Sequence, residues 1–306
     1  MKYLVTGGCG FIGSNTVDLL INKGHTVVVI DNLSSDVHDN FYYNDKAIYY
    51  HYDVSDYIMC SDIFNKYKPD IVLHFAAEAR IQKCIEDPQK AFEVNAMGTL
   101  TMLSLCKKYS VSKLILSSTS AIYGNSSKEQ KEINKPDCLN PYSLSKLHAE
   151  QYCNLYGNLY GVDTVCLRYF NVYGPRNPSK GQYAPVIGIF QKQKKNNQNI
   201  TIIGDGLQTR DFVHVQDVVE ANYKFSLSEQ KYNGEVFNVG TGKAYNINEI
   251  ASKIQLDKSK HEYLPERMGE CRNSKANVEK LKSVLNWIPS RDLMEYLDKT
   301  HIDATL

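Results

Sequence analysis

Residues 2–14, KYLVTGGCGFIGS, join a short apolar run to a loop with glycines at three-residue intervals. Residues 2–6 have the composition of a strand, and Gly7, Gly10 and Gly13 lead into a helix expected over 11–22. Glycine allows a tight turn and lets the backbone approach a pyrophosphate, which would lie at the positive end of the helix dipole. The stretch therefore predicts a strand, loop and helix unit that binds a dinucleotide.

Apolar runs and helical patterns alternate along the first 170 residues. The expected strands are 4–6, 27–30, 48–52, 71–75, 114–118 and 164–170. The expected helices between them are 11–22, 88–109 and 143–160. This alternation predicts an α/β fold with a doubly wound parallel sheet, a Rossmann arrangement covered on both faces.

The rhythm changes after residue 170, where glycines and prolines interrupt the chain as far as Pro185. We expect helices at 185–195, 216–227, 246–255, 275–285 and 291–298, with strands at 200–204, 211–215 and 235–240. This predicts a Rossmann domain at 1–170, with a returning segment at about 211–240. A second, smaller mixed α/β lobe at 171–306 would create a ligand crevice above the sheet.

Composition excludes several kinds of partner. The 35 Lys and Arg against 34 Asp and Glu give a net charge of +1, so no global field attracts nucleic acid or an anionic membrane. The eight cysteines form no Cys-x-x-Cys pair, no apolar signal core precedes the first strand, and no run of about eighteen apolar residues exists. We expect a soluble cytoplasmic protein with reduced thiols, a small-molecule substrate and no metal, because the histidines lack ligand spacing.

Asp31 ends the second expected strand, roughly twenty residues after the glycine loop. A carboxylate there can accept hydrogen bonds from both hydroxyls of an adenine ribose, and its charge repels a 2′-phosphate. No arginine follows at once in Asn32-Leu33-Ser34-Ser35. These features favour NAD over NADP.

Tyr142 and Lys146 fit a Tyr-x-x-x-Lys pattern that would place both side chains on one helix face. The pattern has accidental matches in a chain with 22 tyrosines, namely Tyr42 with Lys46 and Tyr109 with Lys113. A tyrosine beside an ammonium and a positive nicotinamide can act as a base, because both charges stabilise the phenolate.

The chain resembles the extended short-chain dehydrogenase/reductase family, and within it the NAD-dependent nucleotide-sugar epimerases and dehydratases. The resemblance extends over nearly the whole chain in TGGCGFIGS (6–14), DNLSS (31–35), HFAAE (74–78), SSTSAIYG (117–124), PYSLSK (141–146), RYFNVYGPR (168–176), GDGLQTRDFVHVQDV (204–218) and RMGE (267–270). The order of these strings selects Tyr142 and Lys146 over their competitors and adds Thr119 as a catalytic hydroxyl. It also implies that the lobe at 171–306 binds a nucleotide sugar.

The resemblance also implies two sets of binding residues. The cofactor set is Gly7, Gly10, Phe11, Ile12, Gly13, Asp31, Asn32, Ser35, Asp53, Val54, Phe75, Ala76, Ala77, Asn95, Ser117, Tyr142, Lys146 and Tyr169. The substrate set is Arg80, Thr119, Asn171, Arg210, Arg267, Glu270 and Ser274. Arg210 and Arg267 would bind the diphosphate, because arginine offers planar donors and a fixed charge.

The implied activity is oxidation of a sugar 4-hydroxyl to a 4-keto sugar, with Tyr142 as base. Related dehydratases and decarboxylases carry an acid two positions after Thr119, whereas this chain has Ser120-Ala121. It therefore most resembles the 4-epimerases of UDP-glucose and UDP-N-acetylglucosamine. The alternatives are a 4,6-dehydratase, a decarboxylase and, outside enzymes, a dinucleotide-sensing protein.

Two positions bear on the sugar. Ser274 stands where a bulky tyrosine would exclude N-acetylated sugars, so serine favours their admission. Arg80 and Cys84 stand where 4-epimerases commonly have serines, and an arginine beside the hexose would suit a UDP-uronate. The resemblance further implies a homodimer formed through helices at about 88–109 and 143–160.

Overall fold

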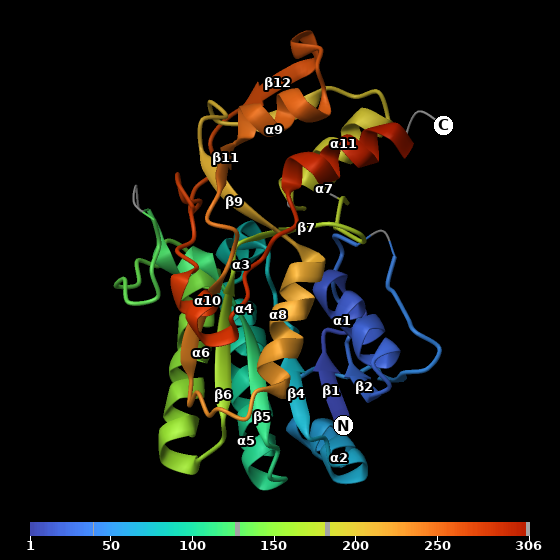
Figure 1. The fold of residues 1–306 in the computed structure, drawn as a ribbon, viewed down its shortest axis with the longest axis vertical. Coiled ribbons are helices and arrows are strands. Elements are labelled where there is room, and N and C mark those ends of the chain that lie inside the picture. Colours follow the sequence, from blue (N-terminus) through green and yellow to red (C-terminus); the bar gives the residue numbers. More distant parts are fainter. Residues whose placement is uncertain (39, 126–128, 181–183, 304–306) are drawn as a thin grey trace.

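A seven-stranded sheet, in which every neighbouring pair of strands is parallel, forms the centre of the protein (Figure 1). The computed structural model describes residues 1–38, 40–125, 129–180 and 184–303. In spatial order the strands are β10 (Glu235–Val239), β6 (Thr164–Tyr169), β5 (Lys113–Thr119), β4 (Ile71–His74), β1 (Lys2–Thr6), β2 (Thr26–Ile30) and β3 (Ile48–Tyr50). The predicted doubly wound α/β sheet is confirmed.

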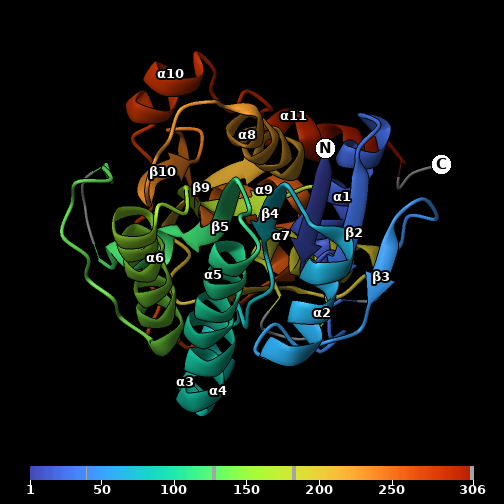
Figure 2. The same cartoon turned by 90° about the horizontal axis from the view of Figure 1, so that it is seen from below.

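Helices cover both faces of this sheet (Figure 2). One face carries α1 (Phe11–Asn22), α8 (Val215–Leu227) and α10 (Glu279–Leu285), and the other α2 (Tyr57–Tyr67), α5 (Gly98–Lys108) and α6 (Pro141–Tyr160). Alternate residues of β1 enter different cores: Tyr3 packs in the cluster that contains Phe225 of α8, and Leu4 in the one that contains Met102 of α5. Burial on both faces explains why the strand sequences are continuously apolar.

A smaller lobe lies above the carboxyl ends of the strands (Figure 1). Its strands are β7 (Asn171–Tyr173), β8 (Ile200–Ile203), β9 (Thr209–His214), β11 (Ala244–Asn246) and β12 (His261–Leu264), and its helices α7 (Val186–Lys195), α9 (Ile247–Ile254) and α11 (Leu293–Asp303). They form two small sheets, β11-β9-β7 and β12-β8, around a core of their own. After β9 the chain returns to the main sheet, where α8 packs on α1 and β10 pairs with β6.

The helix predicted over 88–109 is interrupted. It consists of α4 (Pro88–Phe92), a π-helical segment (Glu93–Met97) and α5, and it is preceded by the unpredicted α3 (Ile81–Glu86). The wide π turn directs the side chain of Asn95 towards the backbone of Glu78, with which it makes two hydrogen bonds. Such interruptions are frequent at functional sites, and apolar periodicity does not reveal them.

The helix predicted over 275–285 begins only at Glu279, because the preceding residues are extended. Lys275 O accepts a hydrogen bond from Gln130 N, and Asn277 N donates to Gln130 O. The unpredicted α2 begins after Asp56, whose carboxylate accepts from Met59 N at 3.0 Å. The remaining predicted elements are confirmed to within a few residues, whereas the strands β7, β11 and β12 were not anticipated.

Helix α6 begins two residues earlier than predicted, because Pro141 occupies its first position. The side chain of Asn140 accepts from Ser143 N at 2.8 Å and caps the helix. Gly161, with φ of +69°, ends it in the left-handed conformation. These signals fix Tyr142 and Lys146 in the first two turns.

Within the described ranges, no helix has both the length and the apolar character needed to cross a bilayer. All eight cysteines lie in these ranges, and none of them forms a disulfide.

Candidate active site

A cavity of about 1010 Å³ lies between the carboxyl edge of the main sheet and the smaller lobe. Residues from both lobes line it, which is the usual position for a ligand site in an open parallel sheet. The residues expected to bind cofactor or substrate all line this cavity except Asp53 and Asn95. Among the described residues, no group of three or more His, Cys, Asp or Glu is placed to hold a metal ion.

The three glycines of the loop have different structural tasks. Gly7 has φ of +67°, and a Cβ on it would lie 2.7 Å from Ala76 N. A Cβ on Gly13 would lie 2.1 Å from Gly7 O, so the loop folds onto α1 only if this position is glycine. A Cβ on Gly10 would meet nothing closer than 3.5 Å. Gly10, at the N-cap of α1 and without a side-chain cap, leaves the helix N-terminus open to an anion.

The carboxylate of Asp31 joins the glycine loop to the end of β2. It accepts hydrogen bonds from Cys9 N and Leu33 N, each at 2.9 Å, and still lines the cavity. Asn32 donates to Asp53 Oδ2 at 2.9 Å. Asp53 is not among the residues that line the cavity, but it holds Asn32, which lines it; its predicted cofactor contact stays a prediction.

The floor of the cavity is formed where the central strands end. Phe75, Ala76 and Ala77 follow β4, while Ser117 lies on β5. Tyr169 ends β6 and donates to Asn222 Oδ1 at 2.9 Å. These side chains meet because parallel strands present their carboxyl ends at one edge.

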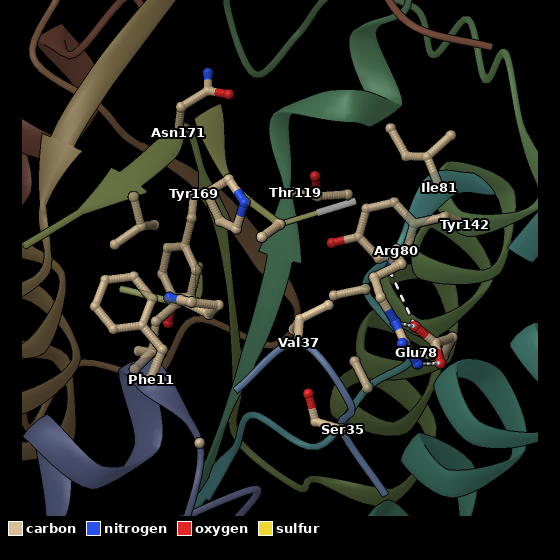
Figure 3. A pocket seen from close by; sticks show the side chains of 18 of the residues that line it. Phe11, Ser35, Val37, Glu78, Arg80, Ile81, Thr119, Tyr142, Tyr169 and Asn171 are labelled. Atoms are coloured by element: carbon tan, nitrogen blue, oxygen red, sulfur yellow. Dashed lines mark hydrogen bonds and ion pairs between the residues drawn. The ribbon is translucent and has the colours of Figure 1, made fainter. Parts of the chain in front are cut away.

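The three predicted catalytic residues converge on the cavity from β5 and α6 (Figure 3). Thr119 ends β5, accepts from Ala121 N at 3.1 Å and hydrogen-bonds with the Tyr142 hydroxyl. Loss of solvation raises the pKa of Tyr142 to about 12, although the Thr119 hydrogen bond opposes the shift. The lowered pKa that a tyrosine base requires is therefore not reached in the protein without its cofactor.

Lys146 is buried, and its burial lowers the pKa of its amine to about 8. Its Nζ has no hydrogen-bond partner among the described residues. A buried donor without a partner costs free energy, on the order of 1–3 kcal/mol. This amine therefore fits a cofactor that brings hydroxyl acceptors, such as those of a ribose.

A buried ion pair fixes the orientation of α6. Glu150, one turn beyond Lys146, accepts from Arg168 Nε at 2.9 Å and Nη2 at 2.7 Å. Ser118 of β5 donates to the same carboxylate at 2.6 Å. The Arg168 guanidinium also lies 4.6 Å from the ring centroid of Tyr123. These contacts join α6 to β5 and β6, the strands that end beside Tyr142.

Asn95 lies behind the cavity wall. It is buried, accepts from Glu78 N at 2.9 Å, and donates to Glu78 O and Ser145 Oγ, each at 3.0 Å. Asn95 is not among the residues that line the cavity, and it holds Glu78 and Ser145 from behind; its predicted cofactor contact stays a prediction. Its partners are 17 and 50 residues away, so no local pattern reveals them.

The two arginines predicted to bind a diphosphate lie close to one carboxylate in the cavity. Nη2 of Arg210 lies 4.0 Å, and Nη1 of Arg267 3.9 Å, from the carboxylate of Glu270. Asn171 donates to Asp211 O at 3.1 Å. Ser274 is buried at the cavity, and its Oγ has no partner among the described residues.

Several lining residues escaped the sequence analysis. They include the α7 side chains Val186, Ile189 and Phe190 and the loop side chains Ser34, Val37 and His38. The amphipathic period of α7 predicts a buried face but not a ligand site. The loop offered no chemical pattern.

The guanidinium of Arg80 is already paired with carboxylates of the protein. It donates to Glu78 through Nε at 2.8 Å and Nη2 at 2.5 Å (Figure 3). It also forms a second ion pair, with Asp36. Two carboxylates therefore already neutralise the arginine that was expected to meet the substrate.

The chain matches known proteins over almost its whole length. The NAD dependent epimerase/dehydratase family matches residues 3–240. The structure of a UDP-glucose 4-epimerase from Thermotoga maritima with UDP-glucose is 36% identical, covers 97% of this chain and 96% of its own, and has a TM-score of 0.91. A UDP-glucuronate 4-epimerase from Thermodesulfobacterium geofontis is 34% identical over 97% of this chain and 94% of its own.

A third match extends the range of sugars. The structure of a UDP-N-acetylglucosamine 4-epimerase from Methanobrevibacter ruminantium, in complex with UDP-N-acetylmuramic acid, is 34% identical. It covers 97% of this chain and 95% of its own, with a TM-score of 0.88. Three proteins named for different sugars thus match almost equally well, so overall similarity does not select among the sugars.

Two variants distinguish the contribution of the glycine loop to stability from its contribution to anion binding. Gly13→Ala should lower the free energy of unfolding by about 1–3 kcal/mol, because its Cβ would overlap Gly7 O. Gly10→Ser should change it by less than about 0.5 kcal/mol, since serine caps helices at least as well as glycine. It should nevertheless weaken NAD binding about tenfold or more. Urea unfolding and calorimetric titration measure the two effects, and unchanged NAD binding by Gly10→Ser would contradict this assignment.

Proposed function

The chain belongs to the NAD dependent epimerase/dehydratase family, and from this premise we propose that it is an NAD-dependent 4-epimerase of a UDP-hexose. The observation that carries the proposal is the convergence of Thr119, Tyr142 and Lys146 beside Ser120-Ala121, a pair without a carboxylate. This arrangement supports removal of a hydroxyl proton but offers no acid at 120 or 121 for eliminating water.

The residues present fit NAD. Gly10 leaves the N-terminus of α1 open for a pyrophosphate, Asp31 presents a carboxylate for ribose hydroxyls, and Lys146 has an unpartnered Nζ. Bound NAD supplies a hydride acceptor and, after hydride transfer, a donor. The carboxylate of Asp31 disfavours a 2′-phosphate at the same place.

Tyr142 takes the proton of the sugar 4-hydroxyl, with Thr119 relaying it or holding the hydroxyl in place. Because its pKa is about 12 in the protein alone, Tyr142 is protonated at neutral pH before the cofactor binds. The Lys146 ammonium and a positive nicotinamide both stabilise the phenolate. The base is therefore activated only in the loaded site, and Tyr142 returns the proton when the 4-keto sugar is reduced on its other face.

The chemistry near Thr119 disfavours dehydration and decarboxylation. Ser120 and Ala121 line the cavity without an acid, and the nearby carboxylate of Glu78 is bound to Arg80. A dinucleotide sensor would not require Thr119, Tyr142 and Lys146 together. Epimerisation uses all three.

A neutral hexose fits the cavity better than a uronate. A uronate requires a cation for its carboxylate, and the Arg80 guanidinium already contacts Glu78 and Asp36. Ser274 is small and buried, and its hydroxyl has no partner among the described residues. It would therefore leave space for an N-acetyl substituent and offer it a hydrogen bond. UDP-glucose with UDP-galactose and UDP-N-acetylglucosamine with UDP-N-acetylgalactosamine are the proposed pairs.

A panel of UDP-sugars followed by NMR of the products tests the reaction. We expect the C4 epimer of UDP-glucose or UDP-N-acetylglucosamine without net NADH, and no 6-deoxy-4-keto or decarboxylated product. Tyr142→Phe should lower turnover by about 100-fold or more, as expected when a general base is lost, while NAD stays bound. Full activity of that variant would refute Tyr142 as the base.

Ser274→Tyr should shift the sugar preference. The larger side chain would fill the space beside the sugar and lower the turnover of UDP-N-acetylglucosamine relative to UDP-glucose by about tenfold or more. Ser274→Ala is the matched control, because it removes the hydroxyl without adding volume. An unchanged ratio in Ser274→Tyr would remove this residue from sugar selection.

We further propose a homodimer formed through α4, α5 and α6, which lie side by side (Figure 2). Large apolar side chains are exposed along this face: Phe92, Met97, Leu144, Leu155, Leu159 and Tyr160. Several large apolar side chains on adjacent helices support a protein interface rather than a solvated surface.

Leu159→Glu should make the protein monomeric in analytical ultracentrifugation, because it would bury an unpaired charge in the interface. Leu256→Glu, at another exposed leucine in the smaller lobe, is the control and should remain dimeric. A dimeric Leu159→Glu variant would place the interface elsewhere.

A further inference from the structure

The segment 33–38, here called the strap, runs along the cavity after β2. Leu33 packs against the main core, while Ser34, Ser35, Val37 and His38 line the cavity beside the glycine loop (Figure 3). Asp36 is absent from this lining and forms ion pairs with Arg80 and Lys83. The strap thus presents four side chains to the cavity and the carboxylate of Asp36 to Arg80 and to α3.

Three attachments fasten the strap at its far end. Asp36 pairs with Arg80 and, at 2.7 Å, with Lys83 Nζ, while Val37 O accepts from Lys180 N at 3.1 Å. The first two come from α3 and the residue before it, and the third from the loop that enters the smaller lobe. The strap therefore bridges the two walls of the cavity.

Arg80 is the more sheltered of the two cations that pair with Asp36. Its side chain is 11% exposed, against 39% for Lys83, and its second partner Glu78 is 19% exposed, whereas the shared Asp36 is 53% exposed. Exposed pairs contribute little because water and salt screen them, whereas a partly desolvated arginine held by a planar carboxylate keeps a fixed geometry. Glu78 thus orients Arg80, and Arg80 can hold the more exposed partner, Asp36.

Glu78 is itself held in place. Asn95 binds both the N–H and the C=O of Glu78, and the same amide donates to Ser145 of α6. The sequence of contacts runs from α6 through Asn95 and Glu78 to Arg80. The strap is consequently attached to the helix that carries Tyr142.

We propose that Arg80 is a positioning residue that fastens the strap over the bound dinucleotide and slows its release. The inference rests on the proposed NAD-dependent epimerisation, in which the cofactor must remain in place between oxidation and reduction of one sugar. A fastened strap keeps the reduced cofactor beside the 4-keto sugar until C4 is reduced again. Release at that stage would leave oxidised sugar and NADH in solution.

The same geometry separates this role from substrate binding. To meet a substrate carboxylate, Arg80 would have to exchange a bidentate contact with Glu78 or the ion pair with Asp36. Either exchange would leave a protein carboxylate without its arginine. The Arg80 guanidinium already has two carboxylate partners, Asp36 from the strap and Glu78 from the segment that follows β4, and Asp36 also pairs with Lys83.

The test is the rate of NAD dissociation from Arg80→Gln, Asp36→Asn and the double variant, measured with a coupled dehydrogenase that traps released NAD. We expect each single variant to release NAD about tenfold faster, and the double variant no faster than Arg80→Gln, because both changes remove one interaction. Arg80→Lys should restore part of the retention. Lys83→Met is the control, with less than about a twofold change, because its pair is exposed.

A second readout follows turnover of UDP-glucose. Arg80→Gln should accumulate free NADH together with the 4-keto sugar, while the wild-type enzyme does not. If no UDP-sugar is epimerised but the dissociation rates change as expected, the proposed function fails and the fastening role stands. NAD dissociation at the wild-type rate in both single variants would overturn the fastening role, and so would a Lys83→Met variant that releases NAD as fast as Arg80→Gln. The role would also be overturned if the Arg80 variants lost only the turnover of UDP-glucuronate, because Arg80 would then be a substrate ligand.

Discussion

The buried pair of Glu150 and Arg168 is the interaction on which the site depends. Two opposite charges are stable in a core only when hydrogen bonds compensate for their lost solvation. Glu150 accepts from Arg168 twice and from Ser118 once, while Arg168 Nη1 has no hydrogen-bond partner among the described residues. The pair joins α6 to β5 and β6. It thereby fixes the distance between Thr119, at the end of β5, and the first turns of α6. A site that needs a hydroxyl, a phenol and an amine in one place is thus supported from behind by a salt bridge that never meets the ligand.

The same burial creates an electrostatic requirement. Desolvation raises the pKa of Tyr142 and lowers that of Lys146, so the protein alone disfavours both charged forms. A cofactor with hydroxyl acceptors and a positive ring reverses both tendencies. Catalytic competence is therefore coupled to loading of the site, and retention of the cofactor becomes as important as its binding. The strap at 33–38 serves that retention.

The side chains that select the substrate lie in the part of the cavity formed with the smaller lobe, and overall similarity to known proteins does not reveal which sugar they select. Relatives named for glucose, glucuronate and N-acetylglucosamine match this chain almost equally. What separates them must be individual side chains. Arg80 suggested a uronate when it was considered as an isolated cation, but its carboxylate partners argue for a neutral sugar. The size of Ser274 then becomes the main local determinant.

The sequence by itself determined the parallel sheet, the glycine loop and the helix that carries Tyr142 and Lys146. These depend on local patterns: alternating apolar runs, glycine spacing, and residues one helical turn apart. Thr119 was added by the resemblance to a family. The tertiary structure alone decided which protein groups Asp53, Asn95 and Arg80 contact. Asn95 turns inward because a π-helical segment interrupts its helix, and Arg80 meets Asp36, 44 positions earlier in the chain, because the strap crosses the cavity. Such contacts join residues with no sequence periodicity between them, so only the folded chain reveals which charges are already paired.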